Sequence, residues 1–218
     1  MTPDRGTRRP LKSRRRPTAA ALAGWLRRRG VAPNAISLVS IVFALGGAAC
    51  LIALPHVGDA ARLGLLPLAA LSIQLRLLAN LMDGMVAVEG GRQTATGVLY
   101  NEIPDRVADT LFLVAAGYAA TWFSWADTLG WGAALAALAT AYVRVLGGAV
   151  GVTQHFVGPM AKQQRMALLT LACLLSMVEL AYDYEGRVLA VALALIITGS
   201  VATFARRTRR IARELTAR

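Results

Sequence analysis

The stretch NLMDGMVAVEGGRQTATGVLYNEIPDRVAD, residues Asn80 to Asp109, joins two apolar segments that both carry polar side chains. Asn80 and Asp83 are three residues apart, so on a helix they share one face. Asn101, Asp105 and Asp109 recur every four residues and form a second stripe on the next segment. Carboxylates inside apolar helices are costly and are usually functional where they occur. The two facing stripes therefore predict a divalent-metal site at a membrane surface.

The composition around this stretch is that of a membrane protein. The chain has 218 residues, of which 56% are hydrophobic and only 17% charged. A soluble domain of this size would carry about 25% charged residues. The deficit lies in long apolar runs, and the length suits one all-α helical bundle rather than two domains.

Six transmembrane helices are predicted, since each span needs about twenty apolar residues. We expect a basic segment over 1–30 that includes an amphipathic interfacial helix near 18–29, a transmembrane domain over 31–206, and a basic tail over 207–218. The predicted spans are 34–54, 62–88, 96–121, 127–150, 164–182 and 187–206.

The net charge of +12 comes mostly from arginines at the two ends of the chain. Such arms can bind nucleic acid, but basic flanks of apolar spans more often lie on the cytoplasmic side against anionic lipid headgroups. Loops near 55–61, 122–126 and 183–186 carry Asp59, Asp127, Asp183 and Glu185 and no Lys or Arg, whereas those near 89–95 and 151–165 contain Arg92, Lys162 and Arg165. Six spans with both termini in the cytoplasm satisfy this pattern. No nucleic-acid partner is expected, and the polar stripes would face the cytoplasm from the inner membrane.

The central stretch resembles the signature of the CDP-alcohol phosphotransferases, D-x2-D-G-x2-A-R-x8-G-x3-D-x3-D. Every spacing matches, and the pattern GVAPNAIS (Gly30–Ser37) resembles the Pro-Asn-x-x-Thr/Ser start of the family's first span. The likeness covers roughly residues 18 to 205. The signature positions are filled here, in order, by Asn80, Asp83, Gly84, Ala87, Val88, Gly97, Asn101 and Asp105.

The resemblance implies transfer of a substituted phosphate from CDP-diacylglycerol to an alcohol, with release of CMP. It makes Asp105 the general base, and it implies a metal, Mg²⁺ or Mn²⁺, held by oxygens of Asn80, Asp83, Asn101 and Asp105. The cytosine is expected near three small residues of the motif. Family members are typically homodimers, so the implied partners are the two substrates, the bilayer and a second copy of the chain. The small residues are Gly84, Ala87 and Gly97.

Three positions depart from the signature: Asn80 and Asn101 replace aspartates, and Val88 replaces an arginine. Each asparagine keeps a carbonyl oxygen but removes one negative charge. A specialised enzyme and a catalytically silent lipid- or nucleotide-binding relative both fit these changes. Neighbouring residues can compensate, or Asp109 can instead be a buried partner of Arg76 or Arg144. The auxiliary candidates are Glu89, Glu102, Asp109 and Arg76.

Lys162 and Arg165 lie before the fifth predicted span, where family members often place basic residues toward the acceptor. There they would bind a phosphate-bearing acceptor, although positive charge in a cytoplasmic loop explains them as well. A third hypothesis is that the chain is a small transporter that couples ions through intramembrane acids. It lacks the inverted repeats that such folds often show.

Overall fold

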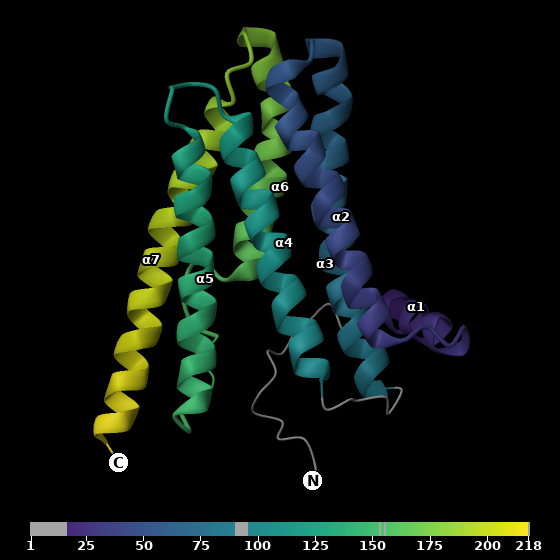
Figure 1. The fold of residues 1–218 in the computed structure, drawn as a ribbon, viewed down its shortest axis with the longest axis vertical. Coiled ribbons are helices and arrows are strands. Elements are labelled where there is room, and N and C mark those ends of the chain that lie inside the picture. The colour runs from purple at the N-terminus through teal and green to yellow at the C-terminus, as the bar shows by residue number, and fades with distance from the viewer. Residues whose placement is uncertain (1–16, 90–95, 153, 155, 218) are drawn as a thin grey trace.

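The computed structural model describes residues 17–89, 96–152, 154 and 156–217, and the described part consists of helices and the segments that connect them. Six long helices run side by side, and the shorter α1 lies across one end of α2 and α3 (Figure 1). The bounds are α1 Pro17–Arg28, α2 Pro33–Ala53, α3 Asp59–Glu89, α4 Gly97–Ala119, α5 Asp127–Ala149, α6 Lys162–Glu179 and α7 Arg187–Thr216, with 3-10 turns η3 Leu54–His56 and η4 Leu180–Tyr182.

Individual residues explain where several of the helices begin or end. Gly30 follows α1 with φ of 74°, a left-handed conformation that glycine adopts without strain. Pro33 then opens α2, because a first-turn position needs no backbone N–H. At the opposite end, Glu179 accepts hydrogen bonds from the backbone N–H groups of Arg187 at 2.7 Å and of Val188 at 3.4 Å. This carboxylate thus satisfies the first turn of α7, a role that the sequence did not reveal.

The packing order encloses the acids of the polar stripes, Asp83, Asp105 and Asp109, between the helices. α2 packs on α3 and α4, α4 packs on α5, and α6 lies between α3 and α7. Small residues allow these close approaches: a Cβ added to Gly130 on α5 would lie 2.7 Å from the carbonyl oxygen of Leu113 on α4. A second cluster of apolar residues seats α1 on α3, through Ala23, Met82 and Val86 among others. Helix interfaces made of small residues, such as Gly130 against α4, are typical of helices that pack in lipid.

The outward surface of the bundle is apolar, as membrane contact requires. Val42, Leu135 and Val178 are large apolar side chains that are more than half exposed. In the described part of the chain, α2, α3, α5, α6 and α7 are long and apolar enough to cross a membrane, judged by length and composition. α4 has 23 residues but carries Glu102, Asp105, Arg106 and Asp109. The all-α membrane architecture is therefore supported, and the sixth span and the side on which the termini lie stay predictions.

The last helix is longer than predicted. The expected span ended at 206, before the basic tail, whereas α7 continues to Thr216. Arg207 and Ile211, one helical turn apart, are both buried in this extension. The tail is thus helical, and its inner face packs against the protein although its composition is polar.

Candidate functional site

Asp83 on α3 is the most enclosed acid of the predicted motif. Its side chain is 4% exposed, and its Oδ2 accepts a hydrogen bond of 2.6 Å from the Ser37 hydroxyl on α2. Its Oδ1 is buried and has no hydrogen-bond partner among the residues that the structure describes, as is true of the Oδ1 of the partly buried Asn80. A buried carboxylate oxygen without a donor is costly, so this corner of the site is arranged to receive a cation or a donor.

Asp105 on α4 faces two cations of the chain itself. The Lys162 ammonium donates to its Oδ2 at 2.5 Å. The Arg76 guanidinium donates to its backbone carbonyl at 2.9 Å and to its Oδ1 at 3.3 Å. Asp105 also interacts electrostatically with Asp83, so the two motif carboxylates belong to one site.

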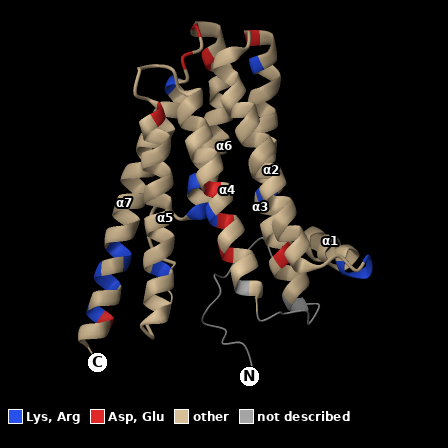
Figure 2. Cartoon of the chain, viewed as in Figure 1, with Lys and Arg blue, Asp and Glu red and all other residues tan. Residues whose placement is uncertain are grey.

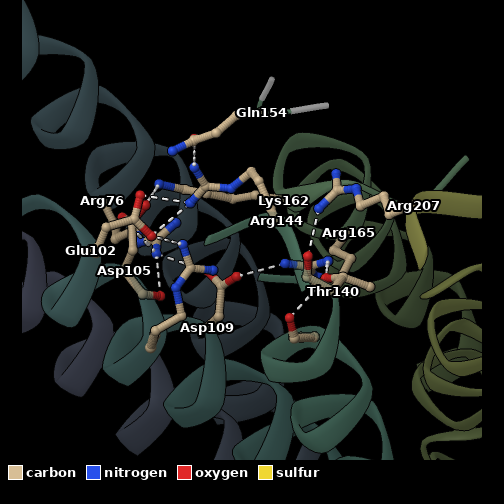
Figure 3. A network of polar contacts seen from close by, with 12 residues as sticks. Arg76, Glu102, Asp105, Asp109, Thr140, Arg144, Gln154, Lys162, Arg165 and Arg207 are labelled. Atoms are coloured by element: carbon tan, nitrogen blue, oxygen red, sulfur yellow. Dashed lines mark hydrogen bonds and ion pairs between the residues drawn. The ribbon is translucent and has the colours of Figure 1, made fainter. Parts of the chain in front are cut away.

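Asp109, one turn further along α4, joins three helices. Arg76 on α3 donates to its Oδ1 at 2.8 Å, and Arg165 on α6 donates to its Oδ2 at 3.0 Å (Figure 3). All three side chains are nearly inaccessible, Arg76 being 0% exposed. Removing one member of such a buried pair is strongly destabilising, because the other charge is left uncompensated. This cluster therefore holds α3, α4 and α6 together behind Asp105.

The network continues into α5, α7 and the segment before α6. Arg165 also contacts the Thr140 hydroxyl at 3.2 Å, while the Thr140 carbonyl accepts a 2.6 Å bond from Arg207 on α7. Closer to the helix end, Glu102 accepts from Arg144 at 2.6 and 2.7 Å. Arg144 in turn donates to Gln154 at 2.8 Å. In Figure 2, acidic positions on α4 lie beside basic positions on the neighbouring helices.

The predicted metal ligands are not all brought together. Asn80 and Asp83 offer buried oxygens without partners, whereas both oxygens of Asp105 contact cations and Asn101 is exposed. Within the described residues, no three His, Cys, Asp or Glu side chains form a metal-binding group. The residues fit one divalent ion on the α3 side, since carboxylate and amide oxygens are ligands that hard cations prefer.

The remaining predicted residues fall into three groups. The small residues Gly84, Ala87 and Gly97 are partly exposed, as a nucleotide surface requires. Lys162 is directed at Asp105, while Arg165 is 1% exposed and held within the ion cluster. The side chains of Val88 and Glu89 lie outside the described residues.

Two further contacts were missed or misassigned from the sequence. Ser37, the last residue of the Pro-Asn-x-x-Ser pattern, contacts Asp83, and only that pattern singled it out. The alternative partner suggested for Asp109, Arg144, binds Glu102 instead. Arg76 does pair with Asp109.

Comparison with solved structures identifies the fold. No protein-family model matches the sequence, and a search of curated proteins finds no match. The Mycobacterium tuberculosis phosphatidylinositol phosphate synthase with CDP-DAG bound superposes with a TM-score of 0.68 at 19% identity, over 88% of this chain and 92% of that one. The same synthase in complex with manganese and citrate gives 0.70 at 18% identity, over 88% of each chain. Its apo form gives 0.67 at 18%, over 87% of this chain and 93% of that one. The chain thus has the fold of a phosphatidylinositol phosphate synthase, a CDP-alcohol phosphotransferase, the family that the motif resembles.

Proposed function

We propose that this chain is a membrane CDP-alcohol phosphatidyltransferase, which transfers a phosphatidyl group from CDP-diacylglycerol to an alcohol and releases CMP. One observation carries the proposal: the spaced motif lies on two adjacent helices of the very fold that binds CDP-DAG in the mycobacterial synthase. Its two retained acids, Asp83 and Asp105, belong to one electrostatically coupled site. Residues that matched the motif only by chance would not be expected to lie together in one site.

The reaction forms one phosphorus–oxygen bond and breaks another. The acceptor hydroxyl attacks the phosphorus that carries the diacylglycerol, and the bond from that phosphorus to the bridging oxygen breaks. The bridging oxygen leaves on the phosphate of CMP. The proton of the attacking hydroxyl goes to Asp105, whose position is fixed by Arg76 through its backbone carbonyl and Oδ1.

Other residues of the site bind and orient the substrates. The partly exposed Gly84, Ala87 and Gly97 leave room for the cytidine. The Lys162 side chain, 20% exposed, can bind a phosphate on either substrate. Arg165 is too enclosed to meet an acceptor, and we assign it to holding Asp109. A divalent ion, Mg²⁺ or Mn²⁺, held by Asn80 and Asp83 would supply positive charge to the pyrophosphate.

The setting that we propose is the inner membrane, with six spans, both termini in the cytoplasm and the site facing the cytoplasm. The apolar outward surface and the acidic outer loops support this orientation. We also propose a homodimer, because family members typically form one. Chemical crosslinking in membranes tests this: a band at twice the monomer mass is expected.

The decisive experiment is CMP release by the purified full-length protein, given CDP-diacylglycerol, Mg²⁺ or Mn²⁺ and a panel of alcohols that includes glycerol phosphate and inositol phosphate. Asp83→Ala and Asp105→Ala should abolish release. Arg62→Met, at the outer end of α3, should leave release unchanged, because its side chain pairs with Asp59 there. No CMP with any acceptor, together with no nucleotide binding, would refute the proposal.

A second function, a catalytically silent binding scaffold, is favoured by one specific observation. Both carboxylate oxygens of the proposed base Asp105 contact cations of the chain. The scaffold predicts CDP-lipid binding without CMP release. Restoring both motif aspartates, Asn80→Asp with Asn101→Asp, separates the two: activity gained from zero supports the scaffold, whereas activity lost supports a tuned enzyme.

A further inference from the structure

The charges of the site balance without any added ion. Asp83, Asp105 and Asp109 bring three negative charges, and Arg76, Lys162 and Arg165 bring three positive ones. The two asparagines in the motif have already removed two acids relative to the signature. A divalent ion placed among these groups would add positive charge to a site that is already neutral.

The two sides of the site differ in what they offer a cation. On α4, Asp105 receives Lys162 at 2.5 Å on one oxygen and Arg76 at 3.3 Å on the other. On α3, the Oδ1 atoms of Asp83 and Asn80 are buried and accept no hydrogen bond from the described part of the chain. Lys162 reaches across from α6 and is close enough to interact electrostatically with Asp83 as well.

We propose that Lys162 is a built-in cation, which takes at Asp105 the place that the motif would give to a divalent ion. Metal binding is then confined to the Asn80–Asp83 side, at one ion per chain, and the affinity is limited by the ammonium nearby. The inference rests on the proposed function in one respect, because it explains how an enzyme site with two asparagines keeps its charge balance. The contact between Lys162 and Asp105 does not depend on that function.

The test is binding of Mn²⁺ alone to the purified full-length protein in detergent, followed by the electron paramagnetic resonance signal of free Mn²⁺. The wild type should bind no more than one ion. Lys162→Met should bind Mn²⁺ at least about tenfold more tightly, because a unit positive charge within a few ångströms is removed. The charge-keeping Lys162→Arg and the distant Arg62→Met are matched controls, and both should resemble the wild type.

A second pair of variants keeps the test decisive if Lys162→Met does not fold, as judged by thermal unfolding. Asp105→Asn removes one nearby negative charge and should weaken Mn²⁺ binding by about tenfold, whereas Asp83→Asn removes a ligand and should abolish measurable binding. Loss of measurable binding in folded Asp105→Asn, equal to that in Asp83→Asn, would overturn the proposal because Asp105 would then be a metal ligand. So would two ions in the wild type, an unchanged affinity in folded Lys162→Met, or no binding in either protein.

These outcomes are separable from failure of the proposed function. If no CMP is released but the Mn²⁺ titrations behave as expected, the function fails and the role of Lys162 stands. If CMP is released and folded Asp105→Asn loses Mn²⁺ binding as completely as Asp83→Asn, the function stands and the role of Lys162 fails.

Discussion

Replacing Ser37 by alanine removes the one side-chain donor that Asp83 has among residues 17–89, 96–152, 154 and 156–217. The hydroxyl lies 2.6 Å from Oδ2, and the second carboxylate oxygen already lacks a partner. A hydrogen bond to a charged group contributes about 1.5–3 kcal/mol. If Asp83 must be oriented and ionised during turnover, that loss corresponds to a decrease in kcat/KM of about 10- to 150-fold. Because Ser37 touches the carboxylate rather than the proposed substrates, we regard it as a positioning residue.

The assay is CMP release at varied CDP-diacylglycerol, with thermal unfolding measured on the same samples. Ser37→Thr keeps the hydroxyl and should recover most of the activity. Ser40→Ala is the matched control, since its hydroxyl binds the Ser37 carbonyl at 2.6 Å and not Asp83. Its kcat/KM should fall by no more than about fivefold, which corresponds to the roughly 1 kcal/mol that a neutral hydrogen bond contributes. Equal activities of folded Ser37→Ala and wild type would refute the role that we give to Ser37.

Further predictions concern the stability of the bundle in detergent, measured by chemical or thermal unfolding. Arg165→Met should lower the free energy of unfolding by about 3–5 kcal/mol, because Asp109 loses one of its two cationic partners. Adding Asp109→Asn to this variant should recover part of that loss. If the effects of the two substitutions simply add, the ion cluster is contradicted. Ser200→Ala should leave stability unchanged or raise it by up to about 1 kcal/mol, because its buried hydroxyl has no partner. Gly130→Ala should destabilise the α4–α5 crossing by about 1–3 kcal/mol, whereas Gly64→Ala, with nothing within 4 Å of the added carbon, should not; similar effects of the two would contradict the close approach.

Periodicity and charge predicted the helices well, because apolar runs bounded by Gly, Pro and acidic turns leave few alternatives. The pairing of Arg76 with Asp109 was accessible for the same reason: a charge in an apolar helix needs an opposite charge. The end of α7 was missed because the prediction stopped where arginines begin. The buried face of that extension, with Arg207 and Ile211, depends on packing against other elements.

The site itself was less predictable, because its contacts join residues far apart in the chain. Ser37 and Asp83 are 46 positions apart, and Asp105 and Lys162 are 57 apart. Spacing places residues on one helix face but does not say which other helix covers them. The spacing also predicted that Asn101 binds the metal together with Asp105. In the structure, Asn101 lies in the second turn of α4 and is exposed.

The ion cluster has a consequence for how the protein is made. In the membrane setting that we propose, Arg76 on α3 is synthesised before Asp109, and both precede Arg165 on α6. A charge at the centre of a lone helix opposes insertion by about 2.5–3.5 kcal/mol. Pairing across α3 and α4 removes much of that barrier, which favours entry of these two helices into the bilayer as one hairpin. Arg165 then meets an Asp109 that is already in place, so the order of the chain is also a workable order of assembly.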